Sequence, residues 1–304
     1  MTARTIVDKI QTLKRERNAI ILAHNYQPDE VQAIADFIGD SLALSRTAAK
    51  TDAAVIVFCG VHFMAETAAI LSPHKTVLMP EPDAGCPMAD MISAAQLRAF
   101  KQEHPGALVV AYVNSSAAVK AESDICCTSS NAQDVVQSLP EDRDIIFIPD
   151  KYLGSYVAAQ TGRKLILWNG YCPIHVKIQP EDIERRKREH PAAKVAVHPE
   201  CTPPVIQRAD AVLSTEGICR YAGRPEVKEL IVGTEIGVLY RLRTEHPEKR
   251  FYPASDTAVC PNMKKTTLEK VLWSLERMEH IVSVPPDIAT RARQAVDAMI
   301  AIGT

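Results

Sequence analysis

The sequence predicts an α/β protein of three similar units arranged around a pseudo-threefold axis. Short β-rich runs alternate along the chain with segments of helical apolar spacing, which is typical of parallel sheets covered by helices. Four kinds of landmark residue then recur three times, at spacings of 86 or 88 residues. Such self-similarity indicates repeated structural units. We expect three units, at residues 1–86, 87–172 and 173–260.

The expected elements follow this alternation from end to end. A helix at Thr5–Arg17 takes the place of the helix that follows a cysteine in the later units. Strands are expected at Ala19–Ala23, Ala53–Phe58, Thr76–Met79, Leu108–Val113, Asp144–Ile148, Lys164–Leu167, Lys194–Val197, Glu229–Val232 and Arg250–Tyr252. Helices between them include Asp29–Phe37, Val61–Leu71, Tyr152–Thr161 and Thr234–Thr244. Two closing helices within residues 261–304 are expected to pack on the first unit.

Composition limits the function classes. With 304 residues, 46% of them apolar, the chain can bury a sizeable core. A net charge of −2 and an aromatic content of 5% argue against a nucleic-acid-binding surface. Neither a signal peptide nor a membrane-spanning apolar run is evident, so we expect a cytoplasmic protein that does not bind membranes. Eight cysteines in a reducing compartment indicate metal binding or catalysis rather than disulfides.

The first landmark is a cysteine followed by proline, at Cys86, Cys172 and Cys260. Three units closed around an axis would bring these cysteines together. No C-x-x-C pair of the kind typical of structural zinc sites occurs. Isolated cysteines from distant segments suit a [4Fe–4S] cluster. Three ligands leave one iron open, as a Lewis-acid catalyst requires.

The other landmarks are polar residues after strands. Two positions at the end of one strand in each unit would point the same way in extended geometry. They are occupied by His24 and Tyr26, Tyr112 and Asn114, and His198 and Glu200. A hydroxyl recurs further on, at Ser41, Ser129 and Thr215. We expect these hydroxyls at helix starts, where they would help to bind a small dicarboxylate or phosphate.

Together these motifs resemble the quinolinate synthase family of NAD biosynthesis, and the resemblance covers nearly the whole chain. It rests on Ala-His24-Asn-Tyr26-Gln, Gly-Asp-Ser41, Cys86-Pro-Met-Ala-Asp, Tyr112-Val-Asn114-Ser, Thr-Ser129-Ser-Asn, Cys172-Pro-Ile-His175, His198-Pro-Glu200-Cys and Ala-Val-Cys260-Pro-Asn-Met. The resemblance implies three αβα-sandwich domains and a [4Fe–4S] cluster held by the three cysteines. It also implies condensation of iminosuccinate (iminoaspartate) with dihydroxyacetone phosphate to give quinolinate, phosphate and water. An oxidase or dehydrogenase that makes iminosuccinate would then be a functional partner.

The resemblance also implies residue roles. Tyr26 and Glu200 are expected to transfer protons, with His24 and His198 completing the catalytic set. The implied substrate contacts are His24, Ser41, Tyr112, Asn114, Ser129, His175, His198, Glu200 and Thr215. Some family members carry C-x-x-C-x-x-C near the third cluster ligand. Here Cys260 stands alone, so redox control through that motif is not expected.

Two other function classes remain open at this point. Enzymes of diphthamide synthesis also use three cysteines from three similar domains, and they cleave S-adenosylmethionine. The acid–base residues at the strand ends favour condensation over that radical chemistry. An iron–sulfur sensor that binds nucleic acid is the second alternative, and the near-zero net charge argues against it. The remaining cysteines are expected to be structural: Cys59, Cys126, Cys127, Cys201 and Cys219.

Overall fold

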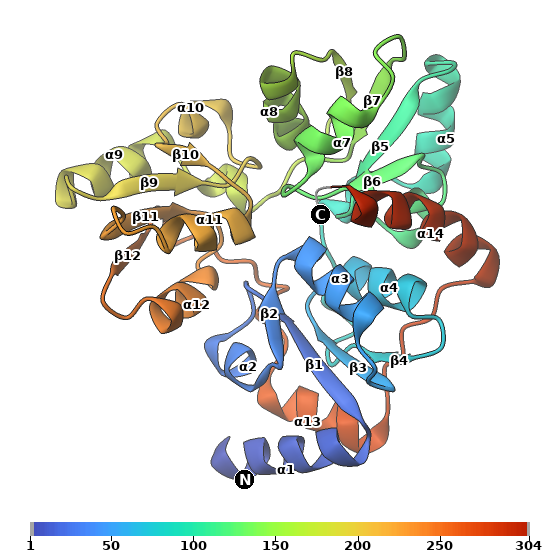
Figure 1. The fold of residues 1–304 in the computed structure, drawn as a ribbon, viewed down its shortest axis with the longest axis vertical. Coiled ribbons are helices and arrows are strands. Elements are labelled where there is room, and N and C mark those ends of the chain that lie inside the picture. Colours follow the sequence, from blue (N-terminus) through green and yellow to red (C-terminus); the bar gives the residue numbers. More distant parts are fainter. Residues whose placement is uncertain (1–2, 303–304) are drawn as a thin grey trace.

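The computed structural model describes residues 3–302 and contains three four-stranded sheets, each made only of parallel strands. Figure 1 shows them as three lobes around a common centre. The predicted α/β class with three similar units is therefore confirmed. The ends of the predicted ranges, residues 1–2 and 303–304, lie outside the described residues.

The first lobe runs from the N-terminus to β4. Its elements are α1 (Ala3–Glu16), β1 (Ala19–His24), α2 (Asp29–Ile34), β2 (Phe37–Gly39), α3 (Ser41–Lys50), β3 (Val55–Cys59), α4 (His62–Leu71) and β4 (Thr76–Leu78). Both faces of its sheet are covered. Ile21 and Leu22, neighbours in β1, belong to different apolar clusters, because successive strand residues point to opposite faces.

The second lobe repeats this order after a short 3-10 turn. Its elements are η1 (Ala89–Met91), α5 (Ala94–Glu103), β5 (Leu108–Tyr112), α6 (Ala117–Lys120), β6 (Ile125–Cys127), α7 (Ala132–Ser138), β7 (Ile145–Ile148), α8 (Lys151–Thr161) and β8 (Leu165–Leu167). The strand order β6-β5-β7-β8 matches the order β2-β1-β3-β4 of the first lobe. The N-terminal helix α1 thus corresponds to α5, as predicted.

The third lobe repeats the order again. Its elements are η2 (His175–Lys177), α9 (Pro180–Glu189), β9 (Lys194–Val197), α10 (Pro203–Ile206), β10 (Ala211–Val212), α11 (Thr215–Ala222), β11 (Glu229–Gly233), α12 (Val238–Glu245) and β12 (Arg250–Pro253). Its strand order is β10-β9-β11-β12. Three sheets with one topology support a true repeat.

Two helices close the chain. Helix α13 (Leu268–Arg277) packs against α1 of the first lobe. Helix α14 (Pro286–Ala301) contacts α4 of the first lobe but also α6 and β6 of the second (Figure 1). Among the described residues, no helix is both long and apolar enough to cross a lipid bilayer.

The sequence-based strands agree with the structure, except that one edge strand per sheet was missed. These are β2, β6 and β10, which have only three, three and two residues. The helix expected at Asp29–Phe37 ends at Ile34, because Phe37 begins β2.

A further repeated residue stabilises each sheet. The Asp36 carboxylate accepts the N–H of Ile21 at 2.8 Å, beside the start of β1. Asp124 and Asp210 make the equivalent bonds at the start of β5 and β9, at 2.7 and 2.8 Å. These aspartates keep the same spacing as the other landmarks, which strengthens the case for three copies of one unit.

Candidate active site

The three lobes enclose one cavity of about 230 Å³, at the carboxyl ends of their sheets. Parallel sheets place functional residues at this edge. Every predicted site residue lines the cavity: His24, Tyr26, Ser41, Cys86, Tyr112, Asn114, Ser129, Cys172, His175, His198, Glu200, Thr215 and Cys260. Residues up to 236 positions apart in sequence are thereby brought together.

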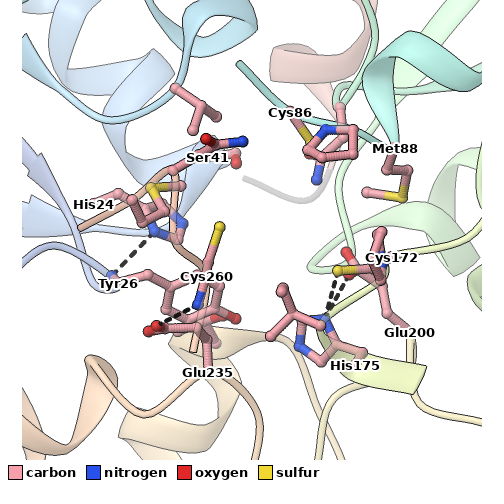
Figure 2. Close-up of a pocket in the computed structure, with 18 of the residues that line it drawn as sticks. His24, Tyr26, Ser41, Cys86, Met88, Cys172, His175, Glu200, Glu235 and Cys260 are labelled. Atoms are coloured by element: carbon pink, nitrogen blue, oxygen red, sulfur yellow. Dashed lines mark hydrogen bonds and ion pairs between the residues drawn. The ribbon is translucent and has the colours of Figure 1, made fainter. Parts of the chain in front are cut away.

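The cysteines come from equivalent loops. Cys86, Cys172 and Cys260 follow the last strand of each sheet, and Figure 2 shows them around the same space. All three are free thiols. Burial raises the pKa of Cys86 to about 12 and raises the pKa of Cys172 and Cys260 as well. Neutral buried thiols suit a metal site, because coordination replaces the thiol proton and offsets the free-energy cost of burying a thiolate.

The other cysteines lie elsewhere. They belong to the apolar clusters on the faces of the sheets and do not line the cavity: Cys59, Cys126, Cys127, Cys201 and Cys219. Burial raises the pKa of Cys59 and of Cys126 to about 12. Such thiols behave as small apolar side chains.

A chain of hydrogen bonds joins Tyr26 to Glu200. The Tyr26 hydroxyl lies 2.6 Å from the hydroxyl of Thr234, which lies 2.8 Å from His175 Nε2. His175 Nδ1 lies 2.8 Å from Glu200 Oε2, and Glu200 Oε1 accepts the hydroxyl hydrogen of Tyr112 at 2.5 Å. Tyr26 and Glu200, the two residues expected to transfer protons, are therefore connected through two bridging side chains.

Glu200 is an anion in this network. The carboxyl is almost fully buried, and burial alone pushes its pKa upwards. The neighbouring His175 and the hydrogen bonds from His175 and Tyr112 outweigh burial and hold the pKa below its ordinary value. Burial and the Glu200 charge raise the pKa of Tyr26, so its hydroxyl keeps its proton at neutral pH.

The two strand-end histidines are neutral. Burial lowers the pKa of both His24 and His198 to about 3. Their Nδ1 atoms accept the backbone N–H of Tyr26 and of Glu200, at 3.2 and 3.3 Å. Each proton is therefore on Nε2. His198 Nε2 lies 3.0 Å from the hydroxyl of Ser129, so this histidine acts as a donor towards the cavity.

The predicted hydroxyls line the same cavity. Ser41 and Thr215 are the first residues of α3 and α11, as expected. Ser129 lies in a turn three residues before α7, which begins only at Ala132, so the expected helix-start position is wrong for this residue. The side-chain oxygen of Asn114 is buried and has no hydrogen-bond partner within residues 3–302.

A polar junction ties the lobes together beside these hydroxyls. Ser130 Oγ donates to Asp40 Oδ2 at 2.7 Å and accepts from Ser214 Oγ at 2.8 Å. Each of the three residues precedes or follows a predicted substrate-binding hydroxyl and comes from a different lobe. Burial raises the pKa of Asp40. Asp40 also lines a second, more open pocket with Arg46 on the outer side.

Several residues of the site were missed from the sequence. Thr234 bridges Tyr26 and His175, and Glu235 lines the cavity and contacts Lys264 at 3.0 Å. Both follow β11 and have no polar counterpart after β3, where Gly60 and Val61 stand. A search for residues present in all three units therefore cannot find them.

Potential metal ligands in the cavity include one tighter group. Donor atoms of Cys172, His175 and Glu200 all lie within 4.8 Å of one another. His175 and Glu200 already bind each other, whereas the three cysteines occupy equivalent positions in the three lobes. The cysteine set is the one that a group with threefold symmetry would use.

Comparisons with known proteins show the family to which the chain belongs. Residues 8–301 match the family described as "Quinolinate synthetase A protein". The chain is 63% identical over 297 residues to "Quinolinate synthase" of Dehalococcoides mccartyi (strain CBDB1), with 98% of both chains covered. It is 56% identical over 302 residues to "Quinolinate synthase" of Geobacter metallireducens, with 99% of both covered. It is 54% identical over 297 residues to "Quinolinate synthase 1" of Methanosarcina acetivorans, with 98% and 97% covered.

Proposed function

Because this chain belongs to the quinolinate synthase family, we propose that it condenses iminosuccinate with dihydroxyacetone phosphate to give quinolinate, phosphate and water. The observation that carries the proposal is the single cavity that gathers three equivalent cysteines and the strand-end acid–base residues. An oxidase or dehydrogenase acting on aspartate would supply the imine. Family membership favours this reaction over the cleavage of S-adenosylmethionine.

The proposed cofactor is a [4Fe–4S] cluster on Cys86, Cys172 and Cys260. Three soft thiol donors, all at least partly buried and on equivalent loops, fit three corners of such a cluster. When bound, it supplies an iron without a protein ligand, which acts as a Lewis acid on an oxygen or nitrogen of the substrate.

Substrate binding is assigned to the hydroxyls and the asparagine that line the cavity. Both substrates are small anions, and the hydroxyls of Ser41, Ser129 and Thr215 can donate to carboxylate or phosphate oxygens. Ser41 and Thr215 also lie at helix N-termini, whose free N–H groups favour negative charge. The unpartnered oxygen of Asn114 can accept a hydrogen bond from an amine, imine or hydroxyl group of the substrate.

Proton transfer is assigned to the hydrogen-bonded chain. Ring formation requires tautomerisation and loss of water, so protons must leave carbon and reach departing oxygens. Glu200 is ionised and can take a proton, while the Tyr26 hydroxyl can give one. Thr234 and His175 lie between them and provide a continuous path for returning the proton. Burial of the chain excludes bulk water.

Cysteine variants test the cofactor. We expect Cys86→Ala, Cys172→Ala and Cys260→Ala each to lose the cluster or become inactive after anaerobic reconstitution. Cys126→Ala and Cys219→Ala, at buried positions outside the cavity, serve as matched controls and should keep iron, sulfide and activity. An active, fully loaded Cys172→Ala variant would contradict the shared site.

A spectroscopic experiment tests the open iron. Quinolinate carries a ring nitrogen beside a carboxylate and can chelate one metal through both. Adding it should change the electron paramagnetic resonance spectrum of the reduced cluster, and ⁵⁷Fe labelling should place the change on one iron. An unchanged spectrum at saturating quinolinate would exclude direct iron catalysis. Incubation with S-adenosylmethionine should yield no cleavage products.

A further inference from the structure

The loop that carries each ligand cysteine is tied to the neighbouring strand by an equivalent backbone hydrogen bond. In every lobe, the N–H three residues beyond the third strand of the repeat donates to the carbonyl two residues before the cysteine. These bonds are His62 to Ala84 at 2.9 Å, Lys151 to Gly170 at 2.9 Å, and Ile236 to Ala258 at 3.0 Å. The backbone tie is therefore part of the repeated unit.

In two lobes a carboxylate adds a second tie to the cysteine itself. Asp150 Oδ2 accepts the backbone N–H of Cys172 at 3.1 Å. Glu235 Oε1 accepts the backbone N–H of Cys260 at 3.0 Å. Both acids stand two residues beyond their strand, β7 or β11, and both are completely buried. Asp150 and Glu235 therefore occupy equivalent positions, and each accepts a hydrogen bond from the backbone N–H of the cysteine in its lobe.

The remaining oxygen of each acid is also engaged. Asp150 Oδ1 accepts the N–H groups of Tyr152 and Leu153, both at 2.8 Å, and so caps α8. Glu235 Oε2 accepts the N–H of Gly237 at 2.7 Å. Each carboxylate therefore clamps the cysteine backbone to the chain that follows the strand. Capping α8 needs only one oxygen, so it does not account for the bond to Cys172.

Burying a carboxylate costs free energy unless hydrogen bonds or counter-charges replace its contacts with water. Neither Asp150 nor Glu235 has any exposed surface, so each relies on its hydrogen bonds to offset the cost of burial. Glu235 has Lys264 as a partial counter-charge at 3.0 Å. At such a buried position, a carboxylate makes hydrogen bonds to backbone N–H groups that an apolar residue cannot make.

The first lobe shows what the unit looks like without the acid. Val61 occupies the equivalent position, two residues beyond β3, and it is buried beside the cavity. Cys86 follows Val61 at the same distance in sequence as Cys260 follows Glu235. The backbone tie is present there, and the side-chain tie is missing. The fold of the loop thus does not require the carboxylate.

We propose that Asp150 and Glu235 are positioning residues that fix the Cys172 and Cys260 backbones in the ligand conformation before the cluster binds. The inference rests on the [4Fe–4S] function proposed above. A cysteine whose N–H is held by a carboxylate loses less conformational freedom when its sulfur binds iron. Groups that orient metal ligands typically contribute 10- to 100-fold to metal retention.

The test compares three isosteric variants. Asp150→Asn keeps one oxygen for the α8 cap and turns an amide towards Cys172, and Glu235→Gln does the same to Cys260. Asp124→Asn is the matched control, because its carboxylate accepts the N–H of Val109 at 2.7 Å at the far end of a sheet. After anaerobic reconstitution, the rate of cluster loss to an iron chelator is followed by visible absorbance.

We expect Asp150→Asn and Glu235→Gln to lose the cluster about tenfold faster than wild type or more. Their reduced electron paramagnetic resonance spectra should differ from wild type. Asp124→Asn should lower the unfolding midpoint but leave both the rate and the spectrum unchanged. Because Glu235 caps no helix, Glu235→Gln carries the test if Asp150→Asn fails to fold.

The outcomes separate the two proposals. A wild-type protein that holds no cluster would refute the proposed function and the inference with it. A wild-type protein that holds a cluster, with both variants losing it at the wild-type rate and with the wild-type spectrum, would overturn the inference alone. A control that loses its cluster as fast as the variants would overturn it too, since the effect would then follow from general destabilisation.

Discussion

Replacing Glu200 with glutamine perturbs one charge at the centre of the hydrogen-bonded chain. Glutamine has nearly the same volume, and it can still accept from Tyr112 or face His175. It cannot carry the negative charge that the contacts with His175 and Tyr112 stabilise, and it cannot take a proton. The variant therefore removes the proposed proton acceptor with little change in packing.

The expected effect is a loss of turnover of about 10²-fold or more, the usual contribution of a positioned general acid or base. The contacts of 2.5 Å to Tyr112 and 2.8 Å to His175 are hydrogen bonds to an ionised acceptor. Such bonds contribute about 1.5–3 kcal/mol each, so some loss of stability is expected as well. Cluster content should not change, because Glu200 is not among the proposed ligands.

The assay is anaerobic formation of quinolinate at saturating substrate, normalised to iron and sulfide content. Glu216→Gln is a suitable control, because Glu216 pairs with Arg241 at 2.7 Å and does not line the catalytic cavity. It should reduce stability without reducing turnover. Near-normal turnover of a fully loaded Glu200→Gln variant would refute the proton-transfer role, and an effect on KM alone would indicate binding instead.

Two further predictions follow from burial at the site. Since folding lowers the pKa of His24 and His198 from 6.5 to about 3, the unfolded chain takes up protons first. The contribution of the two neutral histidines to the free energy of unfolding is complete above pH 6.5. It falls by up to about 1.4 kcal/mol per pH unit for each histidine as the pH drops towards 3. Urea unfolding between pH 7 and pH 5 should show a shallower loss for His24→Gln, and an equal slope would contradict the assignment. Ser130→Ala removes a hydrogen-bond donor from buried Asp40 and should reduce the free energy of unfolding by about 1–3 kcal/mol. Ser138→Ala is the control, because it loses only a hydrogen bond to a backbone carbonyl in its own helix. Equal losses of stability for the two variants in calorimetry would contradict a stabilising role of the polar junction.

The sequence was most informative where units repeat. The strands predicted from β-rich runs occur in the structure, because a buried parallel strand needs a run of apolar residues. The edge strands β2, β6 and β10 were not predicted, and each of them pairs with only one neighbouring strand in its sheet. Asp36 and its two counterparts repeat at the same spacing, so a wider search for repeated positions would have found them.

The site residues that occupy repeated positions could be predicted from the sequence, whereas those at positions that do not repeat were missed. All the predicted residues line one cavity, because equivalent positions of three units face a common axis. Thr234, Asp150 and Glu235 were missed because Val61 and Gly60 stand at the corresponding places in the first unit. Their contacts depend on loops that meet only after folding, and neither period nor composition indicates them.

The threefold arrangement also explains which positions differ between the units. The cluster proposed above would be held by three equivalent positions, so three copies of one unit could bind it with the same residue, cysteine. The proposed substrates would have no such symmetry. Around them the copies must diverge, and the strand-end pairs have become His24 with Tyr26, Tyr112 with Asn114, and His198 with Glu200. The positions that stayed alike would thus match the symmetric cofactor proposed for this chain, and those that diverged would match its asymmetric substrates.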